Sequence, residues 1–67
     1  MKVVQFNDGF YGIRKVKWLT PGYLYWDFQR KEWVPSKQLI IRRDACKAEW
    51  EEAEMLYHEM LDRGEPV

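Results

Sequence analysis

Apolar and polar residues alternate along the first half of the chain, and this period of two predicts β-strands joined by short turns. We expect strands at about 2–7, 10–19 and 23–28. A fourth strand would follow a turn at Arg30-Lys31 and end at Pro35, because proline cannot donate a hydrogen bond to a ladder.

Asp8-Gly9 is typical of a two-residue hairpin loop, in which both central residues need a positive φ. Such a loop would place Phe6 opposite Tyr11 and Val4 opposite Ile13. These four side chains would then share one buried face of the sheet, which a slip of one residue would undo.

Alternation breaks within the second strand, where Arg14 and Lys15 stand side by side. The apolar residues before this pair have one parity and those after it have the other. We therefore predict a β-bulge here, which would put both charges in solvent and restore one apolar face.

The turn at Thr20-Pro21-Gly22 leaves two registers open. A three-residue loop would pair Val16 with Trp26 and would again collect the apolar residues on one side. A two-residue loop would instead place Trp18 opposite Tyr25.

The third strand, YLYWDF, divides its aromatic residues between two faces of the sheet. Its even-numbered residues, Leu24, Trp26 and Phe28, are expected in the core, and its odd-numbered residues point the other way. The turn at 30–31 would place Phe28 opposite Trp33 as a cross-strand aromatic pair.

The apolar period becomes helical from residue 45 to residue 63, which predicts one amphipathic helix. Asp44 is a candidate N-cap and Gly64 a candidate C′ residue. The preceding Gln38–Ile41 is either a short edge strand or the lead-in to this helix. The apolar stripe of the helix would consist of Cys46, Trp50, Ala53, Leu56, Tyr57, Met60 and Leu61.

Together these elements predict an α+β fold, a three- to four-stranded antiparallel β-meander with one C-terminal amphipathic helix packed on one face. Residues 1–67 are expected to form a single domain, with the meander at about 2–41 and the helix at about 45–63. One helix can cover one face of the sheet. The other face would be open to solvent, to a second copy or to a partner.

The small size of the chain limits what its core can supply. With 67 residues, a single core rarely contributes more than about 3–5 kcal/mol. The one cysteine excludes an intramolecular disulfide, so 4 Trp, 4 Tyr and 3 Phe are expected to supply most of the buried area. The unpaired thiol, the polar N-terminus and the absence of a long apolar run predict a cytoplasmic protein with no signal peptide and no membrane span.

The net charge of zero conceals two oppositely charged halves. Residues 1–43 carry nine Lys/Arg and three Asp/Glu, whereas residues 44–67 carry two and eight. This asymmetry indicates either charged partners or an attraction between the two halves that stabilises the fold.

Catalysis is not indicated by the residues that could support it. Cys46 and His58 would lie about 18 Å apart on one helix and could not form a nucleophile–base pair. We expect Cys46 to act as a small buried apolar residue and His58 to be a solvated helix residue. No metal-binding spacing and no phosphate-binding glycine loop is present, so we predict a non-enzymatic protein without metal or cofactor.

Two surfaces are candidates for recognition. Basic and aromatic residues on an open sheet face would suit single-stranded nucleic acid, with bases stacked on the rings and cations along the phosphates. Acidic residues on the outer face of the helix would suit a basic protein. The first set consists of Arg14, Lys15, Lys17, Tyr23 and Tyr25, and the second of Glu51, Glu54, Met55, His58 and Asp62. A homodimer is a third hypothesis, because an open face and opposite charges suit a symmetric contact.

The motifs YGIRKVKW, YLYWDF, a following Trp and IRRDACKAEWEEAEML together resemble a type of short phage reading frame. The likeness covers about residues 11–61. It implies a small phage-encoded protein without enzymatic activity that binds a host protein in the cytosol and redirects or inhibits it. The resemblance assigns no role to any single residue.

Overall fold

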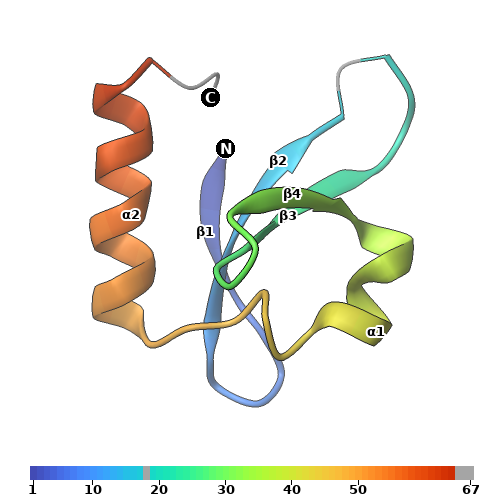
Figure 1. Ribbon diagram of the computed structural model, residues 1–67, viewed down its shortest axis with the longest axis horizontal. Coiled ribbons are helices and arrows are strands. Elements are labelled where there is room, and N and C mark those ends of the chain that lie inside the picture. Colours follow the sequence, from blue (N-terminus) through green and yellow to red (C-terminus); the bar gives the residue numbers. More distant parts are fainter. Residues whose placement is uncertain (18, 65–67) are drawn as a thin grey trace.

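A computed structural model describes residues 1–17 and 19–64 of the chain. Four strands form one antiparallel sheet in the order β1-β2-β3-β4, so each strand pairs with the next one along the chain (Figure 1). This confirms the predicted meander with a C-terminal helix. The elements are β1 (Lys2–Gln5), β2 (Tyr11–Val16), β3 (Tyr23–Asp27), β4 (Glu32–Pro35), the 3₁₀ turn η1 (Ser36–Gln38), α1 (Leu39–Arg42) and α2 (Trp50–Asp62).

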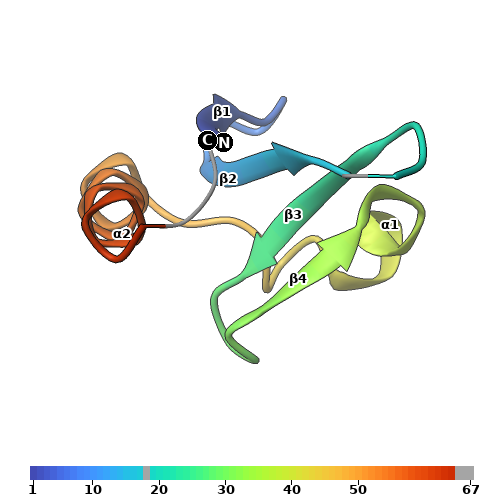
Figure 2. The same cartoon turned by 90° about the horizontal axis from the view of Figure 1, so that it is seen from above.

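The two helices lie on opposite sides of the twisted sheet, as Figures 1 and 2 show. Residues that face each other across strands share one face of a sheet. Ile13 and Trp26 point toward α2, whereas Tyr25 and Val34 point toward α1. Both Ile13 and Val34 have no exposed surface, so each face of the sheet is buried over part of its area. The expectation that the second face is left open is therefore wrong, because α1 and the chain after it cover it in part.

The β1–β2 hairpin has a three-residue loop, and the predicted register is wrong by one residue. The N–H of Phe6 donates to the carbonyl of Phe10 over 2.8 Å, which leaves residues 7–9 as the loop. Gly9 has a φ of +87° and Asp8 Oδ1 accepts from the Phe10 N–H at 3.3 Å, so the loop combines a turn with a left-handed glycine. Val3, not Val4, consequently faces Ile13.

The β2–β3 pairing is continuous through Arg14 and Lys15, so the predicted bulge is wrong. The two neighbours point to opposite faces, and each covers an aromatic ring with its cation. Arg14 Cζ lies 4.1 Å from the centre of the Tyr23 ring, and Lys15 Nζ lies 4.3 Å from that of Trp33. A basic side chain on each face is stabilised by these contacts and needs no bulge to reach solvent.

The β2–β3 loop is longer than either predicted alternative. Val16 faces Tyr23 rather than Trp26, and the Lys17 N–H donates to the Gly22 carbonyl at 3.1 Å. The predicted partners of Trp18 concern a residue outside the described part of the chain.

The β3–β4 turn also differs from the prediction, and Trp33 faces Trp26 instead of Phe28. The two indole rings are 5.2 Å apart and 70° to one another, an edge-to-face pair. Asp27 determines this turn, because its Oδ1 accepts the N–H groups of Gln29 and Arg30 at 2.9 Å each. The strand therefore ends before Phe28.

The predicted helix begins too early by five residues. Leu39–Arg42 forms a helix of its own, and α2 starts at Trp50, with Glu49 rather than Asp44 at its N-cap. The connection at 43–49 does not continue as a helix, because its backbone pairs with the sheet at Ala48. Ala48 exchanges two hydrogen bonds with Tyr11, of 2.8 and 2.7 Å, in an isolated bridge.

The remaining helix predictions are confirmed in their main points. Gly64 follows the helix with a φ of +85°, which is the C′ geometry expected of it. Of the predicted stripe, Ala53 and Met60 are buried and Leu56, Tyr57 and Leu61 are half-buried, whereas Trp50 is 50% exposed, so its place on a buried stripe is wrong. Cys46 is buried as well, but it lies in the connection at 43–49 and not on the helix stripe.

Candidate functional site

The outer face of α2 is acidic and exposed. The helix contains five acids and no lysine or arginine, whereas its inner side packs Ala53 and Met60 against the sheet. Met55 interrupts the acidic surface with a side chain that is 68% exposed. The acids of α2 are Glu51, Glu52, Glu54, Glu59 and Asp62.

No lysine or arginine in the described part of the chain forms an ion pair with any acid of α2. The side chain of His58 contacts one of these acids, with its Nε2 3.2 Å from Glu54 Oε2 on the adjacent turn. Arg63 donates from Nε to the backbone carbonyl of Glu59 at 3.4 Å, and not to a carboxylate. One ion pair joins the two halves of the described chain, and it links Lys47 to Asp8. Direct pairing between the basic half and the acidic helix therefore does not account for the charge asymmetry.

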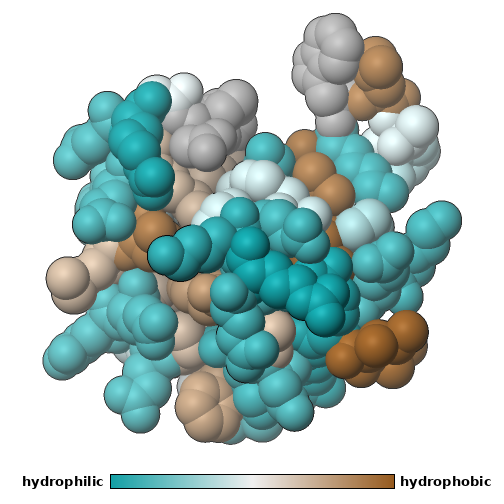
Figure 3. Space-filling model, in the orientation of Figure 1, coloured by the Kyte–Doolittle hydropathy of each residue, from teal (hydrophilic) through white to brown (hydrophobic). Residues whose placement is uncertain are grey.

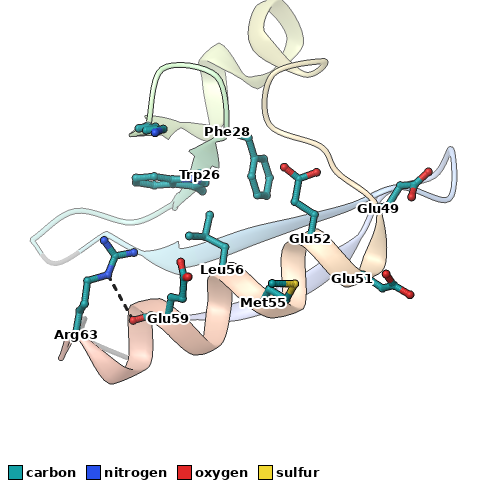
Figure 4. Close-up of a pocket in the computed structure, with 10 residues that line it drawn as sticks. Trp26, Phe28, Glu49, Glu51, Glu52, Met55, Leu56, Glu59 and Arg63 are labelled. Atoms are coloured by element: carbon teal, nitrogen blue, oxygen red, sulfur yellow. Dashed lines mark hydrogen bonds between the residues drawn. The ribbon is translucent and has the colours of Figure 1, made fainter.

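A groove of about 830 Å³ runs between α2 and the end of β3 (Figure 4). Trp26, Phe28 and Leu56 point toward one another across it and form its apolar floor. Met55 lies at the edge. Its remaining lining is charged, with four acids and two bases, namely Glu49, Glu51, Glu52, Glu59, Lys31 and Arg63.

The groove exists because α2 lies over the β1–β2 side of the sheet. The Trp50 ring contacts Tyr11 of β2 edge-on, with centroids 5.0 Å apart. The twist of the sheet turns β3 and β4 away from the helix, as Figure 2 shows. Trp26 of β3 and Phe28 just after it are thus only half covered.

The structure divides the five predicted residues of the acidic face into two groups. Glu51 and Met55 line the groove. Glu54, His58 and Asp62 do not line it, and Glu54 is paired with His58.

The floor of the groove was missed by sequence reasoning. Strand alternation predicts Trp26 and Phe28 in the core, and the helix stripe predicts Leu56 there. All three are half-buried, so they serve the core and the groove at once. The sequence does indicate that Glu52 and Glu59 lie beside the floor, since both flank Leu56 on the neighbouring turns of the helix.

The five residues predicted to bind nucleic acid do not share one face. Arg14, Tyr23 and Tyr25 lie on the α1 side of the sheet, and Lys15 lies on the other side over Trp33. Tyr25 is half-buried, with its ring centre 6.0 Å from that of Phe6, whereas Tyr23 is 41% exposed. Lys17 follows β2. Its aliphatic chain runs close to Gly22, with Cδ 3.7 Å from the point where a Cβ on that glycine would stand.

Exposed apolar residues form a further feature of the surface on α1. Ile40 and Ile41 are 89% and 86% exposed. Figure 3 shows an apolar patch at this end of the molecule, away from α2. Gln5 and Phe6 of the first hairpin adjoin Ile40 across a smaller hollow of about 340 Å³.

Cys46 is a buried apolar thiol, as expected. It has no exposed surface, and burial raises its pKa to about 11, with a further contribution from the charge of Asp27. His58 is exposed on α2, also as expected. Within residues 1–17 and 19–64, no three His, Cys, Asp or Glu side chains lie close enough together to hold a metal ion.

The fold and the site define a small α+β domain with an acidic, apolar-floored groove. None of its described helices has the length and apolar character that a membrane crossing requires. Comparison of the chain with protein-family models, with curated proteins and with solved structures gave no match.

Proposed function

We propose that this is a small non-enzymatic binding protein that modulates or inhibits a host macromolecule by protein–protein contact. The contact surface is the acidic side of α2, and the partner surface is basic. The observation that carries the proposal is that no lysine or arginine in the described part of the chain pairs with the acids of α2.

Two acids near the C-terminal end of α2 oppose the stability of the helix that carries them. Glu59 and Asp62 stand in its last turn, where the negative end of the helix dipole repels them, and no basic residue lies within that turn. Glu59 and Asp62 are three residues apart, as are Glu51 and Glu54, and like charges at this spacing are unfavourable. Charges that weaken a marginal domain are readily explained by a role in binding.

The biological setting rests on the resemblance to short phage reading frames. It supports a phage-encoded protein that acts in the host cytosol. Many such proteins work by occluding or redirecting a host factor, and a domain of 67 residues with an exposed charged surface suits that role.

Affinity capture from host lysate, with and without nuclease, tests the proposal. We expect specific host proteins that survive nuclease treatment and are lost with the triple variant Glu51→Lys, Glu54→Lys, Asp62→Lys. The matched control reverses three exposed bases of the other half, Lys2→Glu, Arg30→Glu and Lys37→Glu, and should retain the captured proteins. An unchanged set of proteins with the acidic-face variant would contradict the proposal.

Single-stranded nucleic acid is the second candidate partner. The guanidinium of Arg14 lies 4.1 Å from the centre of the exposed Tyr23 ring. This arrangement supports the candidate, because a cation contacts the phosphate of a nucleotide and an aromatic ring stacks on its base. Capture that is abolished by nuclease would favour this reading.

A further inference from the structure

We infer that the groove between α2 and β3 holds a short basic segment of a partner protein, anchored by one large apolar side chain. This inference rests on the proposed function and names the kind of partner. The apolar side chain enters between Trp26, Phe28 and Leu56, and the flanking lysines or arginines lie against Glu52 and Glu59.

The floor of the groove is suited to a large apolar side chain. Two aromatic rings and one leucine converge on the same space from β3, from the turn after it and from α2 (Figure 4). The volume of about 830 Å³ is within the range of sites that enclose an organic ligand. An aromatic side chain buried there would remove about 150–250 Å² of its own surface from water. Met55 at the edge is a flexible side chain that adapts to different shapes.

The walls select the charge of the segment. Four acids and two bases surround the floor, so the groove carries an excess of negative charge. An acidic segment or a nucleic-acid strand would be repelled. A purely apolar segment would strip water from carboxylates without replacing it, which is costly. Lysine or arginine beside the apolar anchor gives these carboxylates a partner.

The length of the groove limits the segment that it holds. Its lining runs along α2 from Glu49 to Arg63, a rise of about 20 Å at the helical spacing. An extended chain covers this distance in about six residues. The partner segment is therefore short, and a folded basic domain would have to present it as a loop or a terminus.

Selection from a library of random twelve-residue peptides displayed on a carrier tests the inference with the intact protein as bait. We expect enriched peptides to contain one Trp, Phe, Leu or Met flanked by lysines or arginines. The strongest peptide should bind about tenfold more weakly to Glu52→Lys, Glu59→Lys, since two charge contacts are reversed. The outer pair Glu54→Lys, Asp62→Lys makes the same change in charge outside the groove and should bind nearly as well as the unmodified chain.

Several results would overturn the inference. These are failure to enrich any peptide, enrichment of acidic peptides, and equal weakening by the two pairs of substitutions. A dimer in light scattering that the groove pair dissolves would also do so, since the occupant would then be a second copy. Far-UV circular dichroism of each variant establishes that it is folded. Met55→Ala, at an exposed position, provides a further variant of the groove in which the charge is unchanged.

The inference and the proposed function fail in different ways. Loss of host capture with the outer pair but not with the groove pair would leave the proposed function standing and exclude the groove. Host capture that survives both pairs would exclude both.

Discussion

Arg42 Nη2 lies 2.8 Å from Oδ2 of Asp27, a carboxylate without any exposed surface at the end of β3. The same nitrogen lies 2.8 Å from Oε1 of Glu32 on β4. This contact ties α1 to the last two strands. Since Asp27 also accepts the two N–H groups that form the β3–β4 turn, one residue couples the turn, the sheet and the first helix.

Asp27 makes the stability of the domain sensitive to acid. Its burial raises its pKa, but hydrogen bonds from the Arg30 and Gln29 N–H groups and the charge of Arg42 outweigh burial, so the pKa falls below its ordinary 3.8. The unfolded chain thus takes up this proton first as the pH falls. The stabilisation is complete above about pH 4 and is lost as the pH drops through the lower pKa of the folded state.

We expect Asp27→Asn to lower the free energy of unfolding at pH 7 by about 1.5–3 kcal/mol, the range for hydrogen bonds to a charged group. Urea unfolding at pH 7, 5, 4 and 3 measures this and should show a flatter decline toward acid for the variant. Asp8→Asn is the control, because Asp8 also has a lowered pKa, chiefly from its hydrogen bond with Lys47, but is exposed. An equally steep decline in Asp27→Asn would contradict this account.

Cys46 should be nearly inert in the folded protein. Burial raises its pKa to about 11, and reactive thiols are thiolates, so both access and ionisation oppose labelling. We expect an aromatic disulfide reagent at pH 8 to label the thiol slowly in buffer and rapidly in 6–8 M urea, about the denaturant needed to unfold small domains fully. Fast labelling without denaturant would show that the connection at 43–49 opens readily.

The fold class could be predicted because it depends on local periods in the sequence, whereas the registers depend on contacts between distant residues. The alternation and the helical stripe identified the sheet and α2. The early end of β3 depends on how Asp27 bonds its own turn, and the late start of α2 depends on the pairing of Ala48 with Tyr11. Neither contact produces a periodic pattern in the sequence from which it could be predicted.

The candidate site was predictable in its charge and not in its shape. The acids of α2 are evident from the sequence, and an amphipathic helix must expose them. Trp26 and Phe28 have the pattern of core residues, and they are half exposed only because α2 lies over the other two strands. Which strands a helix crosses is set by the whole packing of the domain.

Gly12 should not tolerate a side chain. A Cβ at this position would lie 2.7 Å from Cε2 of Phe6 and 2.9 Å from the backbone carbonyl of Cys46. The ring could shift, but the carbonyl belongs to the buried connection before α2. We expect Gly12→Ala to lower the free energy of unfolding by about 1–3 kcal/mol, as overpacking does.

Thermal unfolding of Gly12→Ala and of the double variant Gly12→Ala, Phe6→Leu separates the two contacts. The smaller side chain of the double variant relieves the clash with the ring but not the clash with the carbonyl. Full recovery of stability relative to Phe6→Leu alone would show that the carbonyl of Cys46 gives way after all.

The second candidate function predicts that nucleic-acid binding depends on Arg14 and Tyr23 rather than on the full set of five residues. We expect a mobility shift with a single-stranded oligonucleotide that weakens steeply with salt. The double variant Arg14→Ala, Tyr23→Ala should abolish the shift. Lys15→Ala is the control, because Lys15 lies on the opposite face. Absence of a shift at low salt would remove this candidate.

Charge reversal at the two ends of α2 should separate binding from stability. Asp62→Lys places a cation at the negative end of the helix and should raise the free energy of unfolding by about 0.3–1 kcal/mol. Glu51→Lys places the same cation in the first turn and should lower it by a similar amount. Both variants should capture the host partner more weakly, because each removes one acid from the side of α2 that the proposed contact covers, although only Glu51 lines the groove that holds the short segment.

Chemical denaturation and partner capture on the same preparations measure the two effects. A variant that is more stable and binds less well excludes loss of fold as the cause of weaker binding. If Asp62→Lys stabilised the domain without any change in capture, the acid at this position would have no part in recognition. If both variants shifted stability in the same direction, the helix dipole would not explain the cost of the acidic surface.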